Sequence, residues 1–200
     1  MAERPRILLA SQNAGKCREL ARILDRFEVL SLADFPAIGF PEEGGDYLEN
    51  ARIKAQTAAR RLELPAVADD SGLEVEFLDG APGPYSARLG GPGLDDRGRV
   101  EYLLELLKTA EPPRRARFYC AAACVWPDGR IRSAEGICEG EILLAARGER
   151  GFGYDPIFRA IGQDRAMAEL TAEEKDDLSH RGRAFRALAE QIHAVFEGNG

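Results

Sequence analysis

The chain has 200 residues, of which 44% are hydrophobic and 30% charged, and its formal net charge is −7. This length suits one compact domain with a sizeable core, and the acidic balance disfavours a protein that binds long nucleic acid through its backbone charge. No apolar run approaches the roughly 18 residues that a membrane span requires, and the amino terminus lacks a signal-peptide layout. We therefore expect a cytoplasmic protein without a nucleic-acid or membrane partner.

The first half of the chain alternates predicted strands and helices. In chain order, the sequence predicts a strand at 6–11, a helix at 14–27, a strand at 28–32, a loop at 36–45, a helix at 47–64, and β structure at 66–69 and 73–78. The first helix is predicted because its apolar residues recur at helical spacing, as in Cys17, Leu20 and Leu24.

The second half of the chain is richer in β structure. The sequence predicts turns over 80–93, a helix at 95–108, a hairpin of 116–126 and 130–137, a strand at 139–145, a loop at 148–158, and helix over most of 171–196. Thr171 and Glu174 form a capping-box pattern at the start of that last helix. The whole pattern predicts an α/β protein with a mixed, twisted sheet flanked by helices.

The four cysteines do not have the spacing of a metal or redox pair. Cys120 and Cys124 lie on a predicted strand, where they would face the same side as small hydrophobes. We expect all four to be free thiols.

The stretch RILLASQNAGKCREL, residues 6–20, resembles a phosphate-binding loop that leads into a helix. A Walker A loop, G-x-x-x-x-G-K-[ST], is excluded because Ala10 stands at its first Gly and Cys17 at its hydroxyl position. Asn13 suits a helix N-cap, which would leave free backbone N–H groups and Lys16 facing a ligand. Either Ser11, Asn13 and Lys16 hold phosphate oxygens, or Asn13 only caps the helix and Lys16 is solvated.

An acidic pair, Asp69 and Asp70, closes a short apolar strand. Ligands of α/β proteins bind at the carboxyl ends of strands, so these carboxylates are candidates to bind Mg²⁺ or to activate a water. A polar turn is the alternative. If the strand continues, the two side chains point to opposite faces, and we expect only one of them to face the site.

Two neighbouring segments offer further charged groups. Glu42 and Glu43 lie in the predicted loop and either supply a second carboxylate or are exposed. Asn50 and Lys54 are four residues apart on one helix face. Lys54 is either directed at the site or extends its charge into solvent from the surface.

Two late segments suit the recognition of a flat ring. The loop GERGFGYDPIF places two aromatic residues between glycines, so it either stacks on a base or forms a rigid turn. The segment EEKDDLSHRG brings Lys175, His180 and Arg181 together in sequence. The other histidine, His193, is expected to be an ordinary helix residue.

Five motifs stand in order along the chain: ASQNAGKCREL, DYLENARIKA, ADDSGLEVEFLDGAPGPYSARLGG, RGFGYDPIF and EEKDDLSHRG. Together they resemble the inosine/xanthosine triphosphate pyrophosphatase family over about residues 6–189. The resemblance implies a Mg²⁺-dependent enzyme, with Mn²⁺ as a substitute, that hydrolyses ITP, dITP and XTP to the monophosphate and pyrophosphate and so cleanses the nucleotide pool. It also implies a homodimer, and a single elongated, two-lobed domain over residues 1–200 with a central cleft.

The resemblance also implies roles for individual residues. Asp70, the second Asp of A-D-D-S-G, would be the catalytic residue and a metal ligand. The second metal ligand would be Glu42 or Glu43, and we favour Glu42, although the segment at 44–47 departs from the family's usual G-x-T-F. The implied substrate-binding residues are Ser11, Gln12, Asn13, Ala14, Gly15, Lys16, Lys54, Ser71, Phe152, Gly153, Tyr154, Asp155, Lys175, His180 and Arg181.

Two other functions stay open from the sequence. One is a related pyrophosphatase with a different base preference, and the other is a nucleotide sensor without catalysis. A panel of nucleotides assayed for pyrophosphate release separates them.

Overall fold

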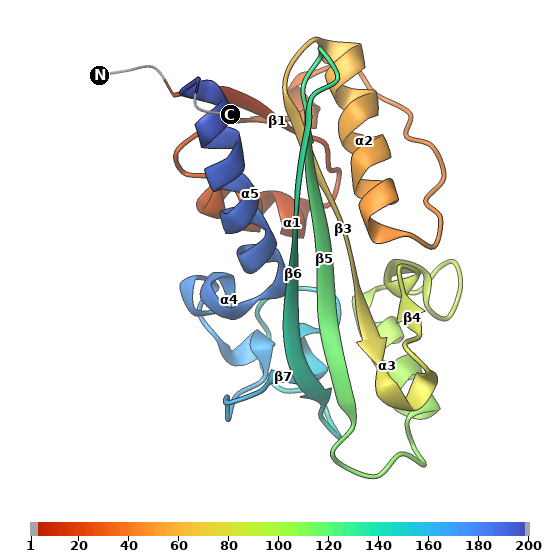
Figure 1. Ribbon diagram of the computed structural model, residues 1–200. Coiled ribbons are helices and arrows are strands. Elements are labelled where there is room, and N and C mark those ends of the chain that lie inside the picture. The colour runs from red at the N-terminus through yellow and green to blue at the C-terminus, as the bar shows by residue number, and fades with distance from the viewer. Residues whose placement is uncertain (1–3, 199–200) are drawn as a thin grey trace.

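The computed structural model describes residues 4–198, which form one mixed sheet with helices packed around it (Figure 1). The strands are β1 (Arg6–Leu9), β2 (Glu28–Ser31), β3 (Ala66–Val75), β4 (Pro82–Gly83), β5 (Arg115–Val125), β6 (Ile131–Ile142) and β7 (Phe158–Ala160). Their order is β2-β1-β3-β5-β6-β7, and β4 also pairs with β3. The pairs β1–β2 and β1–β3 are parallel and the others antiparallel, so the predicted mixed α/β sheet is confirmed.

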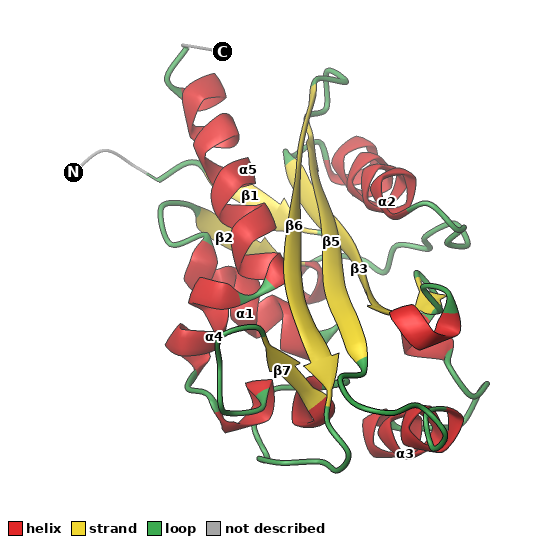
Figure 2. Ribbon diagram, turned by 60° about the horizontal axis from the view of Figure 1, so that its bottom comes forward, coloured by secondary structure: helices red, strands yellow, loops and turns green. Residues whose placement is uncertain are grey.

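Helices cover both faces of this sheet (Figure 2). The α-helices are α1 (Ala14–Ile23), α2 (Tyr47–Leu62), α3 (Asp96–Leu106), α4 (Ala172–Leu178) and α5 (His180–Phe196). Short 3-10 helices occur at Leu32–Asp34, Glu76–Leu78, Ser86–Arg88, Asp155–Ile157 and Met167–Glu169. One buried cluster joins α1 and α5 to the sheet, and another joins α2 to the opposite face, so alternate residues of β3 enter different cores.

The strands are divided differently from the prediction, and β4 and β7 begin in segments predicted as turns and loop. The β segments predicted at 66–69 and 73–78 are joined in the single strand β3, except that 76–78 form a 3-10 helix. The segments predicted at 130–137 and 139–145 are likewise joined in β6, which ends at Ile142. The polar run Asp69–Gly72 suggested a strand end, but β3 continues because β5 pairs with it along its whole length. Conversely, the helix predicted over 171–196 is divided at Ser179, whose side chain caps α5 by accepting a hydrogen bond from Gly182 N.

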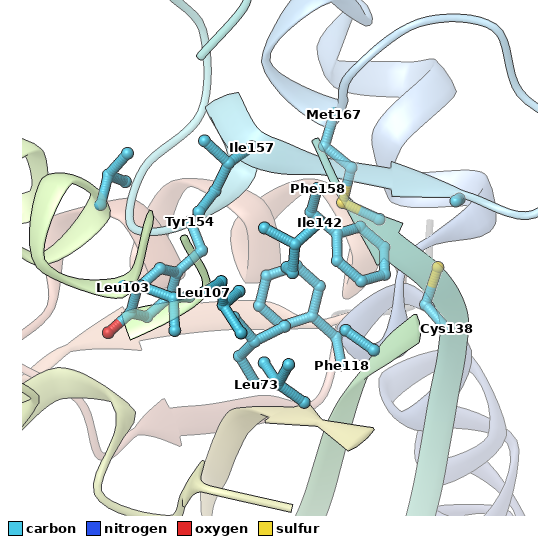
Figure 3. Packing of buried hydrophobic residues seen from close by; sticks show 14 of the residues in the cluster. Leu73, Leu103, Leu107, Phe118, Cys138, Ile142, Tyr154, Ile157, Phe158 and Met167 are labelled. Carbon is cyan, nitrogen blue, oxygen red and sulfur yellow. The ribbon is translucent and has the colours of Figure 1, made fainter. Parts of the chain in front are cut away.

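A third core lies at the far end of the long β3–β5–β6 ribbon (Figure 3). There α3, β7 and the ends of the long strands pack around Phe118, Phe158 and Tyr154. Smaller elements therefore pack near both ends of the long strands β3, β5 and β6. Helices α1 and α2 and strand β2 lie toward one end, and α3, β4 and β7 lie toward the other (Figure 1). The four cysteines are free, as predicted, and Cys120 and Cys124 share one core.

Helix α5 lies directly on β6 at Gly136. A Cβ atom placed there would lie 2.1 Å from His180 O and 2.7 Å from Ala184 N. We therefore expect Gly136→Ala to push the first turn of α5 away from the sheet and to lower the free energy of unfolding by about 1–3 kcal/mol. Urea unfolding followed by circular dichroism measures the effect.

The matched control for that prediction is Gly39→Ala, because nothing lies within 4 Å of a Cβ at Gly39. If the Gly136 and Gly39 variants unfold at the same urea concentration, the close packing of α5 on β6 does not contribute to stability.

Candidate active site

The cleft lies where β3 has no partner on one side. β1 pairs with β3 only at Ala66 and Val67, and β4 pairs with it at Leu73 and Glu74. Within residues 4–198, no strand pairs with 68–72 on this side. Side chains from both faces of β3 reach this gap, so Asp69 and Asp70 both line a cleft of about 410 Å³. The prediction that only one of them faces the site is wrong.

The loop before α1 forms the first wall of the cleft. Asn13 caps α1, as predicted, by accepting a hydrogen bond from Lys16 N at 3.0 Å on its Oδ1. Ser11 Oγ accepts one from Asn13 N at 3.2 Å, and Cys17 turns inward to the core. Lys16 is not a solvated surface side chain, since its Nζ lies 2.8 Å from Asp69 Oδ2.

Asp69 is a buried carboxylate surrounded by donors. Besides Lys16, Arg181 Nε lies 3.3 Å and Ser71 Oγ 3.1 Å from its Oδ2. Burial alone would raise the pKa of Asp69, but the cations Lys16 and Arg181 hold this pKa well below its ordinary value. Asp69 is therefore a fixed anion that holds these two cations at the cleft.

Asp70 has a different environment on the opposite face of β3. Its Oδ2 accepts a hydrogen bond from Asn50 Nδ2 at 2.7 Å, while its Oδ1 lies 3.8 Å from Lys54 Nζ. Burial raises the pKa of Asp70, and this effect outweighs the lowering by Lys54 and by the hydrogen bond from Asn50. Lys54 itself keeps its charge, since burial lowers its pKa less than the nearby carboxylates raise it.

The adjacent carboxylates thus have pKa shifts of opposite sign. Divergent shifts within one site identify the group that takes part in proton transfer. Asp69 is held as a permanent anion by its partners, whereas Asp70 is the more basic carboxylate in the open gap of the sheet. Asp70 is therefore the stronger candidate to orient or deprotonate a water.

The aromatic loop at 152–155 forms the opposite wall. The ring of Phe152 has Lys175 Nζ at 4.7 Å and Arg181 Cζ at 5.4 Å from its centroid. Asp155 Oδ2 accepts hydrogen bonds from Phe152 N at 2.8 Å and from Lys175 Nζ at 2.5 Å. These hydrogen bonds tie the loop to α4, and the loop leaves an aromatic ring at the cleft.

Tyr154 and His180 are both buried beside this wall. Tyr154 packs in the third core, and its hydroxyl donates to Ser86 O at 2.7 Å (Figure 3). His180 stacks on Phe118, with ring centroids 4.7 Å apart. Burial, reinforced by Arg181 and Lys175, lowers the pKa of His180 well below its ordinary value, so the imidazole is neutral. Its Nδ1 is buried without a partner among the described residues, which leaves one hydrogen-bonding group for a ligand.

The cleft collects nearly all the site residues that the sequence predicted. Ala14 and Gly15 are the exceptions, and Gly15 instead packs against Phe152, whose ring lies 2.6 Å from a Cβ placed there. Glu42 and Glu43 both line the cleft, but Glu43 also binds Lys54 Nζ at 2.6 Å and Arg88 at 3.0 Å.

The carboxylates of Glu43 and Asp70 around Lys54 are of the ligand type that Mg²⁺ prefers. Among residues 4–198, no three His, Cys, Asp or Glu side chains come together as a metal cluster. Glu43 and Asp70 nevertheless converge on one cation, Lys54 Nζ. Mg²⁺ is commonly held by one or two carboxylates together with the phosphate oxygens of a substrate. A site with two protein carboxylates therefore matches this pattern. The assignment of Glu42 as the second ligand stays a prediction.

Sequence reasoning missed Glu19, the buried anion behind the aromatic loop. Glu19 contacts Lys175 Nζ at 2.6 Å and Arg181 Nη1 at 2.5 Å. The spacing of charged residues on α1 could have indicated it. Glu19 and Arg22 share one helix face with Gly15, beside the apolar stripe. Arg22 in turn binds Asp176 at 2.7 Å, so this face holds α4 and α5 against α1.

Sequence comparisons show which known proteins this chain is similar to. The model of the Ham1 family matches residues 7–191. The dITP/XTP pyrophosphatase of Bacillus anthracis is 48% identical over 198 residues, which cover 96% of this chain and 98% of that protein.

Solved structures show the same similarity. A HAM1 protein from Coxiella burnetii has a TM-score of 0.84 at 38% identity and covers 94% of this chain and 98% of its own. The nucleoside-triphosphatase, dITP/XTP pyrophosphatase, from Mycobacterium abscessus has a TM-score of 0.73 at 43% identity, with 94% and 99% covered. The chain therefore belongs to the Ham1 family, as shown by these matches over nearly its full length and by the shared fold.

Proposed function

We propose that the chain hydrolyses deaminated purine nucleoside triphosphates, ITP, dITP and XTP, to the monophosphate and pyrophosphate, and so cleanses the nucleotide pool. The observation that carries the proposal is the charge arrangement of the cleft. Six cations line one cleft of a chain whose net charge is −7: Lys16, Lys54, Arg88, Arg99, Lys175 and Arg181. A small polyanion such as a triphosphate is the ligand that such a local cluster attracts.

The proposed reaction is an in-line attack of water on the α phosphorus, with pyrophosphate as the leaving group. Asp70 orients the water and accepts its proton. Lys16 and Lys54 stabilise the charge that builds on the phosphate oxygens. When bound by Asp70 and by Glu42 or Glu43, Mg²⁺, or Mn²⁺ in its place, would supply Lewis-acid stabilisation of the same oxygens.

The base is proposed to stack on Phe152, beside Asp155 and His180. A donor facing the 6-oxo group would favour hypoxanthine and xanthine over adenine, because the 6-amino group of adenine would meet a donor instead of an acceptor. Lys175 and Arg181 lie near the Phe152 ring and provide such donors.

Assembly, domain organisation and location complete the proposal. We propose that the chain is a single two-lobed domain that acts as a homodimer in the cytoplasm, as the resemblance implies. Within residues 4–198, none of the helices has the length and hydropathy to cross a bilayer.

A coupled pyrophosphate assay over a nucleotide panel with Mg²⁺ tests this function. We expect ITP, dITP and XTP to release pyrophosphate far faster than ATP or GTP. Release of orthophosphate would show that a different bond is cleaved, and a preference for modified pyrimidines would show a related enzyme with another base preference. Binding of ITP without turnover would identify a nucleotide sensor.

A further inference from the structure

Helix α3 contributes two polar side chains to the cleft that the proposed mechanism does not use. Asp96 and Arg99 lie in the first turn of α3, and both line the cleft beside Gly153 and Tyr154. We propose that Arg99 binds substrate, by donating a hydrogen bond to an oxygen acceptor on the nucleoside, and that Asp96 positions it. This inference rests on the proposed nucleotide function.

Arg99 has hydrogen-bonding capacity left over. Its side chain is 19% exposed, and its Nη1 lies 3.8 Å from Asp96 Oδ1, which is longer than a hydrogen bond. Its Nε is shielded from solvent and has no hydrogen-bond partner among the described residues. A guanidinium carries five N–H donors, and leaving a buried donor unpaired is costly. A bound acceptor would remove that cost, which makes Arg99 a group prepared for a ligand.

Asp96 places Arg99 at the nucleoside end of the cleft. Asp96 Oδ2 accepts a hydrogen bond from Gly153 N at 2.7 Å, so α3 is joined to the loop that carries Phe152. The phosphate-binding candidates Lys16 and Lys54 come from α1 and α2 instead. If the base stacks on Phe152, the nearest part of the substrate to Arg99 is the base or the ribose.

The acceptor is therefore a neutral oxygen, either a carbonyl of the base or a ribose hydroxyl. A guanidinium only donates, so it favours an oxo group over an amino group at the same position. A contact to the ribose 2′-hydroxyl would instead favour ribonucleotides over deoxyribonucleotides.

Arg99→Met tests the proposal, with Arg97→Met as its matched control. Arg97 lies on the same helix with 87% of its side chain exposed, in an ion pair with Glu101. We expect Arg99→Met to lower kcat/KM for ITP about 10-fold to 100-fold, and Arg97→Met to leave it unchanged. A loss confined to ITP identifies the 2′-hydroxyl, and an equal loss with dITP identifies an acceptor that both nucleotides share, a base carbonyl or the 3′-hydroxyl. Inorganic tripolyphosphate should inhibit wild type and Arg99→Met with the same Ki.

Asp96 has a test of its own. Asp96→Ala is expected to raise KM for ITP while kcat is largely kept, because it frees the loop and Arg99 without touching the reacting atoms. Asp96→Asn should restore much of the loss, since its amide oxygen still accepts from Gly153 N. Equal KM values for wild type and Asp96→Ala would exclude a positioning role.

Two results would overturn the Arg99 proposal. One is equal kcat/KM for Arg99→Met and Arg97→Met. The other is a raised Ki of tripolyphosphate for Arg99→Met, which would place Arg99 at the phosphates. If Arg99→Met fails to fold, Arg99→Lys, which keeps the charge but loses the planar fork, should give an intermediate loss. Absence of pyrophosphate release by the wild type would refute the proposed function alone, and calorimetric ITP binding to wild type and Arg99→Met would then decide the role of Arg99.

Discussion

Replacing Asp70 with Asn is expected to lower kcat for ITP by about 10²–10⁴-fold, the range by which general acid–base catalysis accelerates reactions. The amide is nearly the same size and still accepts the hydrogen bond from Asn50, but it cannot take a proton. Since burial already disfavours the charged form of Asp70, the variant should be at least as stable as wild type at neutral pH. Pyrophosphate release and urea unfolding, measured on the same preparations, separate the two effects.

Asp34→Asn is the control for that experiment, because Asp34 is an exposed carboxylate outside the cleft. Near-normal turnover by Asp70→Asn would remove Asp70 from the chemistry. A loss of both turnover and stability would mean that Asp70 has a structural role instead.

Replacing Glu19 with Gln is expected to lower the free energy of unfolding by about 3–5 kcal/mol, as for the loss of one partner of a buried ion pair. Glu19 is the anion between Lys175 and Arg181, which are both buried. Burial alone would raise the pKa of Glu19, but these two cations hold it below its ordinary value. Urea unfolding in EDTA at neutral pH measures the loss.

The pH dependence of this loss follows from the sign of the shift. A carboxylate with a lowered folded-state pKa contributes stability above its unfolded pKa, and this stability is lost as the pH falls through the folded value. The difference between wild type and Glu19→Gln should therefore be full at neutral pH and should shrink in acid below the ordinary Glu range. Glu28→Gln, in an exposed pair with Arg6, should cost at most about 1 kcal/mol. Equal losses for the two variants would show that burial does not set the strength of the Glu19 cluster.

Local sequence patterns predicted the beginnings of elements better than their lengths. Asn13 and Thr171 were recognisable as caps because a cap depends on residues three positions apart. The continuity of β3 through Asp69 and Asp70 depends on pairing with β5, which lies far along the chain, and no local pattern records that pairing.

The same distinction applies to the site. Nearly all the site residues predicted from the motifs line the cleft, because each motif lies on one short segment. Asp96 and Arg99 also line the cleft but lie outside the motifs. They did not show that Lys16 and Arg181 share Asp69, or that Glu19 joins α1 to α4 and α5. These are contacts between distant segments, and they became visible only when the chain was folded.

The unpaired side of β3 at 68–72 has a consequence for aggregation. An open strand edge is a template on which another chain can add a strand, and proteins protect such edges with charged side chains. Here the unpaired stretch is short and carries Asp69 and Asp70, which are bound to cations on either face. Asp69 and Asp70 thus protect this edge from pairing with another chain as well as lining the cleft. Substitutions that neutralise both carboxylates would remove that protection together with the site.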